Sequence, residues 1–79
     1  MKEIFPRITI DTGVQFGKPV IAGTRVPVET VVGHIAAGDT MADVAKEYGI
    51  KEADVQAALK YASKIIADET VIYSGAFSH

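Results

Sequence analysis

The stretch Met41–Leu59 constrains the fold of this chain most, because apolar residues follow helical spacing on both sides of a glycine. Before the glycine they occupy one helix face at Met41, Val44, Ala45 and Tyr48. After it the same spacing resumes at Val55, Ala58, Leu59 and Ala62. Gly49, between the two sets, is the residue type that most readily adopts the left-handed conformation of a helix end. The pattern predicts two short helices that cross steeply around a glycine turn, a helix-turn-helix unit.

A further helix is predicted before this unit, and the last helix of the unit is predicted to extend beyond it. A first helix begins near Pro27, a residue suited to a first helical turn, and ends at Gly38. Thr40 is predicted to cap the second helix through a capping-box arrangement. The third helix extends past the unit through Ile65 and Ile66 to about Asp68, and its protruding apolar stripe indicates a partner.

Residues 1–27 are predicted to be extended, as a β-arm or small hairpin. Apolar residues alternate with polar residues around a turn at Gly13, at positions Ile8, Ile10, Val14 and Phe16. Helix is excluded here by Pro19, Gly23 and Pro27. The arm is too small to be stable by itself.

The tail after Asp68 is β-prone and uncharged from Thr70 onward, and we expect a possible short C-terminal strand there. Such a strand can pair with the arm, with a second copy or with another protein. The candidate partner-binding residues of the tail are Val71, Tyr73 and Phe77. The predicted fold class is α+β, mainly α. It is one domain over 1–79, with a β-arm (1–27), a three-helix homeodomain-like helix-turn-helix core (28–68) and an apolar tail (69–79).

Size and composition set further limits. At 79 residues, 48% of them hydrophobic, the chain is expected to fold around a small core that association would stabilise, so we expect a homodimer. The sequence contains no cysteine, which excludes disulfides and thiolate metal sites. No segment is long enough to span a membrane and no signal peptide opens the chain, so we expect a cytoplasmic protein.

The net charge of −2 is distributed unevenly. Residues 1–27 carry four cations against two carboxylates, a balance of +2, whereas residues 28–79 carry four lysines against eight carboxylates, a balance of −4. A nucleic-acid reader usually presents a basic stripe on its recognition element. The acidic helical part therefore argues against strong, autonomous DNA binding.

DNA contact nevertheless remains one hypothesis for the third helix. Its exposed face is predicted to carry Lys51, Gln56 and Lys60, which can contact bases or phosphates, and Lys18 adds a cation from the arm. Lys51 stands where a capping Ser, Thr or Asp is preferred, which hints at a functional reason for the lysine. The alternative is an ordinary solvated helix face among carboxylates.

Catalysis finds little support in the residues. His34 lies in a predicted helix and His79 ends the chain, so no histidine pair has metal-ligand spacing. The carboxylates lie at predicted caps, first turns and solvated faces, without a nucleophile or base beside them. We expect no enzyme activity, no metal and no cofactor.

Arg25 and Arg7 are the cations of the arm with the clearest candidate roles. Arg25 follows Gly23-Thr24 in a predicted turn just before the helices. It can either satisfy buried carbonyls of its own chain or project toward a partner protein. Arg7 is the second candidate for the partner-binding role.

From Gly17 to Ala62 the chain resembles the family catalogued as domain of unknown function 433. The resemblance is carried by the block GKPVIAGTRVPV (17–28), by GDT and DVA (38–40 and 43–45) with Tyr48, and by DVQAALKYA (54–62). It implies a homeodomain-like three-helix fold with a β-arm. It also implies an antitoxin of a type II toxin–antitoxin pair, which binds and blocks a PIN-like, metal-dependent ribonuclease and represses its own operon. At Lys51 the chain departs from the Ser or Thr usual in the family, and the tail lies outside the family pattern.

Three functions stay open at this point. The first is the antitoxin-like inhibitor, with Arg25 or Arg7 inserted among the ribonuclease's metal-binding carboxylates or the apolar tail laid on its surface. The second is a stand-alone regulator that binds operator DNA. The third is a structural dimerisation module whose helix-turn-helix only packs.

Overall fold

The protein is mainly helical, with a small sheet at its N-terminal end. The computed structural model describes the backbone of residues 1–76 and the side chains of residues 1–68. A three-stranded antiparallel sheet, ordered β1-β2-β3, comprises β1 (Lys2–Phe5), β2 (Ile8–Ile10) and β3 (Val20–Ile21). The helices are α1 (Val28–Ala36), α2 (Met41–Tyr48) and α3 (Glu52–Ala76). The predicted α+β, mainly α, fold class is confirmed.

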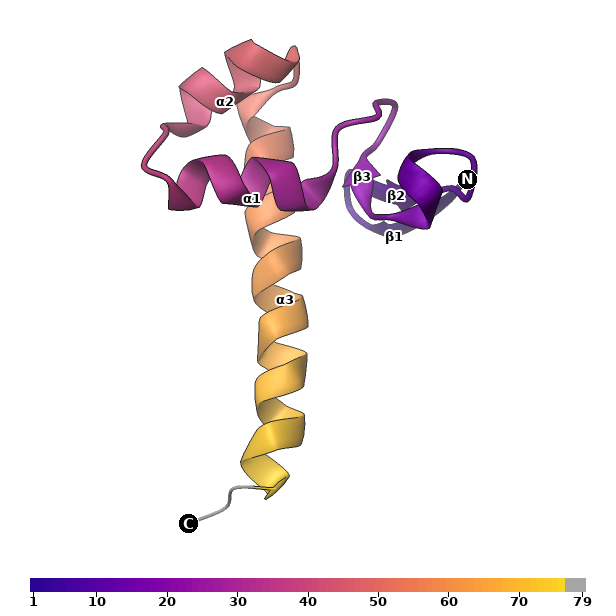
Figure 1. The fold of residues 1–79 in the computed structure, drawn as a ribbon, viewed down its shortest axis with the longest axis vertical. Helices are drawn as coiled ribbons and strands as arrows, with labels where there is room; N and C mark the ends of the chain where they lie inside the picture. The colour runs from indigo at the N-terminus through magenta and orange to yellow at the C-terminus, as the bar shows by residue number, and fades with distance from the viewer. Residues whose placement is uncertain (77–79) are drawn as a thin grey trace.

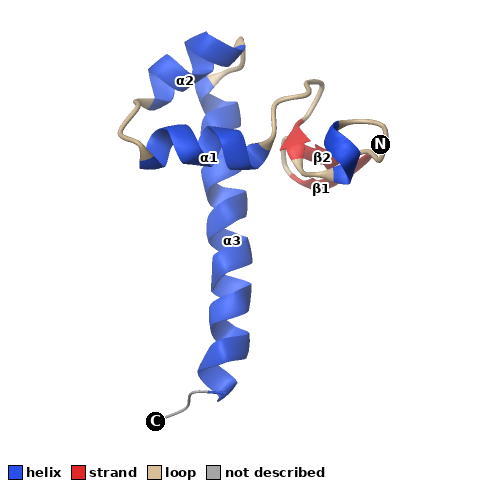
Figure 2. Ribbon diagram, in the orientation of Figure 1, coloured by secondary structure: helices blue, strands red, loops and turns tan. Residues whose placement is uncertain are grey.

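The arrangement in space is uneven. The sheet and its turns lie at one end of α1, while α1 and α2 both pack on the first part of α3 (Figure 1). The rest of α3 projects away from this body as a single helix, as the colouring by secondary structure also shows (Figure 2). The molecule therefore has a compact head and a projecting stalk.

Nearly every helix and strand contributes at least one fully buried aliphatic side chain to the core. The larger side chains with no exposed surface are Ile8 of β2, Ile21 of β3, Val31 of α1, Val44 of α2 and Val55 of α3. The helices also bury the small side chains of Ala45, Ala57 and Ala58, which let the helix backbones approach closely. Because the buried residues of the sheet and of all three helices form one cluster, the arm and the helices share one core.

The helix ends follow the capping chemistry of the sequence. The Thr40 hydroxyl accepts a hydrogen bond from the Asp43 N–H at 3.1 Å. At the other end of α2, Gly49 has a φ of +64°, and the Ile50 N–H donates to the Ala45 carbonyl at 3.0 Å. This six-to-one bond around a left-handed glycine is a Schellman end. It turns the chain sharply from α2 into α3.

Lys51 precedes α3 without a capping side chain, as expected, and Asp54 compensates. The Asp54 carboxylate accepts from the Lys51 N–H at 2.9 Å, which is the reciprocal half of a capping box. The start of α3 is therefore fixed by the third residue of the helix.

The possible C-terminal strand is a wrong prediction, and so is an end of the third helix near Asp68. The backbone stays helical to Ala76. No glycine or proline occurs between Asp68 and Gly75 to stop the helix, and each added residue gains one hydrogen bond once a helix is nucleated. Strand preference of β-branched residues is too weak to overcome that cooperativity.

Within the described residues, no helix combines the length and the apolar character that a membrane span requires.

Candidate functional site: two linked turns of the N-terminal arm

The first turn of the site follows β2 and is held by backbone hydrogen bonds. The Asp11 carboxylate accepts from the Gly13 N–H at 2.8 Å, and the Asp11 carbonyl accepts from the Val14 N–H at 2.8 Å. The next three residues, Gln15, Phe16 and Gly17, all have positive φ, at 50°, 58° and 83°. They form the short turn η1 (Gln15–Gly17).

Phe16 is 96% exposed in this turn. The predicted alternating strand through Val14 and Phe16 is therefore wrong, because the left-handed residues reverse the chain there. A non-glycine residue in that conformation costs on the order of 1–3 kcal/mol. Backbone strain of this kind clusters at functional and ligand-contact sites, and aromatic residues are enriched among the residues that dominate protein interfaces.

The second turn connects β3 to α1. Gly23 has a φ of 77°, and the Thr24 N–H donates to the Ile21 carbonyl at 3.0 Å. The Thr24 hydroxyl donates to the same carbonyl at 2.8 Å and accepts from the Val26 N–H at 3.0 Å. These bonds fix the backbone on which exposed Arg25 stands.

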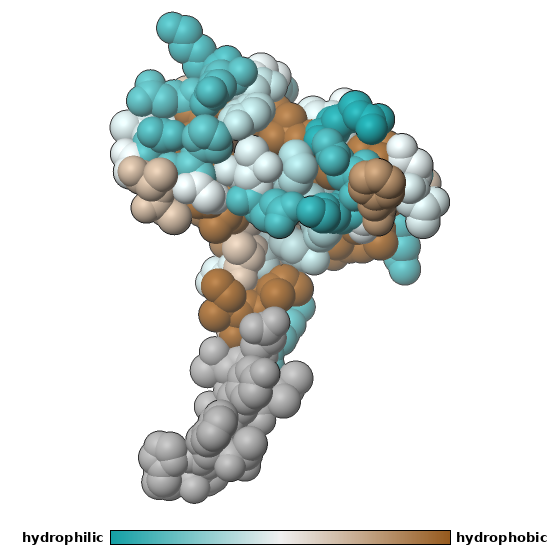
Figure 3. Space-filling view, viewed as in Figure 1, coloured by the Kyte–Doolittle hydropathy of each residue, from teal (hydrophilic) through white to brown (hydrophobic). Residues whose placement is uncertain are grey.

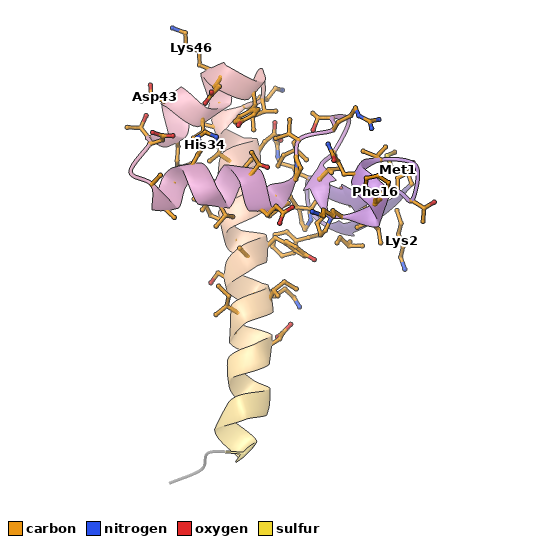
Figure 4. All side chains as sticks on the ribbon, in the orientation of Figure 1. Met1, Lys2, Phe16, His34, Asp43 and Lys46 are labelled. Atoms are coloured by element: carbon orange, nitrogen blue, oxygen red, sulfur yellow. The ribbon has the colours of Figure 1, made fainter. Side chains whose placement is uncertain are left out.

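A side chain joins the two turns. The Gln15 amide donates to the Arg25 carbonyl at 3.0 Å. Beside this bond lies a shallow hollow of about 270 Å³, lined by Met1, Thr9, Asp11, Val14, Val20, Gly23, Thr24 and Arg25. We call the exposed side of the two turns, with Phe16, Arg25 and this hollow, the arm surface. Phe16 lies with Met1 and Lys2 at the end of the molecule far from the stalk (Figure 4).

The two candidate arginines differ in their surroundings. The Arg7 guanidinium donates to the Asp54 carboxylate at 2.9 Å, so it ties the arm to α3. The Arg25 guanidinium makes no ion pair or hydrogen bond with any residue in the described part of the chain. The structure therefore gives Arg7 a partner within the chain and leaves Arg25 open to solvent.

The carboxyl group of Asp54 has a shifted pKa. Burial disfavours its charged form and acts to raise the pKa. Hydrogen bonds from the Lys51 N–H and the Arg7 guanidinium outweigh that effect, and the net pKa lies below the ordinary value of 3.8. Asp54 is therefore a structural anion that joins the arm to the start of α3.

The four candidate DNA-binding residues do not lie on one common surface. Exposed Gln56 and Lys60 line one hollow of about 370 Å³ between the β1–β2 turn and α3. Lys51 lies at the start of α3, and Lys18 is paired with Glu29 of α1 at 2.7 Å beside a different groove. The arm turn at Pro6 and Arg7 borders the Gln56–Lys60 hollow, so α3 does not stand free on that side.

The tail candidates cannot be placed in the same way. Val71 and Tyr73 belong to the helical backbone of α3, but their side chains lie outside the described residues. Phe77 lies outside them entirely.

His34 occupies a more structured position than an ordinary surface residue. One ring nitrogen lies 2.7 Å from the Tyr48 hydroxyl and the other 2.7 Å from the Asp39 carboxylate. The ring thus joins α1 to the end of α2. Among the residues that the structure describes, no three histidine, cysteine or acidic side chains gather as a metal site.

Sequence reasoning missed Phe16 and Gln15 as members of the site. The signal available in the sequence was the aromatic Phe16 between two closely spaced glycines, Gly13 and Gly17. A Lys-Pro pair follows the second glycine directly. The local sequence does not predict that Gln15 donates to the Arg25 carbonyl, because that contact depends on the pairing of β2 with β3.

Comparison with known proteins supports one assignment. The chain is similar to the crystal structure of Rv2018 from Mycobacterium tuberculosis, with 35% sequence identity and a TM-score of 0.62. The match covers 66% of this chain and 24% of the other, so the chain spans about a quarter of that protein's length. No curated protein matches the chain. The model of the family described as "Protein of unknown function (DUF433)" matches residues 8–62, which include both turns of the arm, so the chain belongs to this family.

Proposed function

We propose that the protein is an antitoxin-like, non-enzymatic inhibitor that binds a PIN-like ribonuclease through the arm surface and represses its own operon. The observation that carries the proposal is that Arg25 and Phe16 stand on two turns joined by the Gln15–Arg25 hydrogen bond. Phe16 is 96% exposed, and the Arg25 guanidinium is exposed and has no partner among the described residues. Arginine and aromatic residues dominate the energetics of protein interfaces. Turns that are already ordered lose little conformational entropy on binding.

The arm surface also suits the proposed target electrostatically. The nuclease class comes from the family resemblance, and its metal-binding carboxylates would attract a guanidinium, which can bind a carboxylate through two parallel hydrogen bonds. Arg25 is the better candidate for this role, because Arg7 is held by Asp54. Breaking that internal pair would weaken the binding of Arg7 to a partner.

The test is inhibition of RNA cleavage by a PIN-like ribonuclease encoded next to this chain. Purified nuclease is titrated with the wild-type chain and with Arg25→Ala, Phe16→Asn and Lys46→Ala. We expect inhibition by the wild type and a loss of affinity of at least tenfold for the first two variants. Lys46→Ala is the matched control, because Lys46 is an exposed lysine on α2, away from the arm (Figure 4).

Equal inhibition by the wild type and by an Arg25→Ala/Phe16→Asn double variant would exclude the arm surface as the inhibitory site. No binding of the nuclease by the wild type would exclude the antitoxin role itself.

A second candidate is a DNA-binding regulator, favoured by the exposed Gln56 and Lys60 on α3 and by the tight α2–α3 turn at Gly49. If α3 contacts operator DNA, Lys51→Ala and Lys60→Ala should each weaken binding to the protein's own promoter and flatten its salt dependence. Absence of promoter binding at low salt would exclude this function.

A further inference from the structure

An open apolar groove lies where α3 leaves the body. It has a volume of about 510 Å³ and is lined by Lys18, Pro19, Val28, Glu29, Val32, Gly33, Tyr61, Ala62, Ile65 and Ile66. Ile65 and Ile66 are 39% and 61% exposed. Hydrophobic surface gathers on the stalk just below the head (Figure 3). Contiguous exposed apolar surface of this kind usually marks an interface.

The stalk extends well beyond the head (Figure 1). At about 1.5 Å per residue, the 25-residue α3 is roughly 37 Å long. The segment from Ala67 to Ala76 continues the helix past the last groove residue. Helices in water draw most of their stability from packing of an apolar face, so the exposed Ile65 at the start of the stalk favours packing against another surface.

We propose that the groove is an interface between two copies of the chain, in which the projecting part of α3 from one copy packs against the groove of the other. Ile65 stands both on the projecting helix and in the wall of the groove. The same patch therefore supplies the ridge and the hollow, as the self-complementary surface of a two-fold dimer must.

Charge favours a second copy over other occupants. The rim of the groove carries the ion pair Lys18–Glu29, and the next turn of α3 carries Lys64–Asp68 at 3.2 Å. The patch is thus neutral, whereas residues 28–79 together have a charge of −4. Two copies can meet here without like-charge repulsion, and a polyanion such as DNA gains nothing from an apolar, neutral groove.

Size supports the same occupant. A stable, specific dimer buries roughly 600–1,000 Å² on each copy, and the chain exposes 5318 Å² in all. The groove by itself is too small to reach that area. Contact along the helix beyond the groove adds to that area, since α3 from Tyr61 to Ala76 is roughly 24 Å long.

The experiment is sedimentation equilibrium of the full chain over concentrations of roughly 1–100 μM, which detects dissociation constants in the micromolar range. We expect a monomer–dimer equilibrium in the wild type. Ile65→Glu should weaken the dimer at least tenfold. Ser63→Glu is the matched control, since it adds the same charge on α3 two residues away from Ile65 at an exposed position that does not line the groove.

A second variant separates association from folding. Gly33 lies in α1, lines the groove, and has nothing within 4 Å of the position a Cβ would occupy. Gly33→Lys should raise the thermal stability of the monomer, because glycine is a poor helix former. The same lysine should weaken the dimer at least tenfold, because it places a charge in the groove.

A wild-type chain that stays monomeric throughout the concentration range would overturn the proposal. So would a dimer whose dissociation constant is unchanged in both Ile65→Glu and Gly33→Lys. The proposal does not depend on the ribonuclease partner, because the groove and the arm surface are different parts of the molecule.

Discussion

Phe16 combines an exposed ring with a backbone conformation that non-glycine residues rarely adopt. Asparagine tolerates the left-handed region far better than phenylalanine, and the ring makes little packing contribution at 96% exposure. Phe16→Asn is therefore expected to leave the free energy of unfolding unchanged or to raise it by up to about 1 kcal/mol. Urea denaturation followed by circular dichroism measures this. A stability loss above about 1 kcal/mol would mean that the ring packs in the free protein.

Asp54 links folding stability to pH. Its pKa in the folded chain is depressed, so its contribution is fully present above the unfolded value of 3.8 and disappears as the pH falls through the lower folded value. Asp54→Asn keeps the shape but removes the charge, and should cost about 1–2 kcal/mol at pH 7. The wild-type and variant stabilities should converge below pH 3.8. A constant gap between them down to pH 2 would contradict the assigned role.

The ion pair can be isolated by a double-mutant cycle. Arg7→Ala and Asp54→Ala each remove one partner of the 2.9 Å pair. Because Asp54 also accepts the Lys51 N–H, its replacement should cost more than that of Arg7. We expect a coupling free energy of about 0.5–1.5 kcal/mol from urea denaturation of the single and double variants. Strict additivity would show that the Arg7–Asp54 contact contributes nothing to stability.

At the scale of elements, two glycines in equally open surroundings have opposite roles. Gly49 ends α2 with a φ of +64°, whereas Gly33 lies inside α1 with helical geometry, and neither has an atom within 4 Å of an added Cβ. Gly49→Ala should lower the free energy of unfolding by about 1–2 kcal/mol, the cost of the left-handed conformation. Gly33→Ala should raise it by about 0.5–1 kcal/mol. Thermal denaturation of both variants checks the pair, and equal effects would contradict the explanation.

The sequence predicted those parts of the fold that are set by residues close together in the chain. The cap at Thr40 and the turn at Gly49 are set by neighbouring residues, and the sequence predicted both. The length of α3 was missed because its last turns carry residues with strand preference, which helix cooperativity overrides. The arm was predicted only as extended structure, because its turns depend on pairing among three strands.

In the candidate site, too, the features set by neighbouring residues were predicted and those set by distant contacts were not. Arg25 was identified from its place in a Gly-Thr-Arg turn, which is local information. Whether Arg25 or Arg7 is open to a partner depends on Asp54, which is 47 residues beyond Arg7. Gln15, next to Phe16, donates to the Arg25 carbonyl, and these two residues are ten positions apart in the chain. Contacts over such separations leave no periodic pattern in the sequence.

At the scale of the whole molecule, a small head carries a long stalk. The core holds few large side chains, and the molecule measures 45 × 30 × 18 Å, elongated along the axis of α3. An isolated domain of this size has a marginal free energy of unfolding. Association through the groove would therefore supply a substantial part of the total stability.

This coupling predicts that thermal stability depends on protein concentration. A dimer is stabilised by mass action, and each tenfold rise in concentration adds about 1.4 kcal/mol per mole of dimer when unfolding and dissociation occur together. For a chain of this size the melting temperature of the wild type should then rise by several degrees between roughly 5 and 500 μM. The melting temperature of Ile65→Glu should rise less than that of the wild type across that range, while Ser63→Glu should behave as the wild type does. A wild-type melting temperature independent of concentration would show that the head is stable alone and would contradict association through the groove.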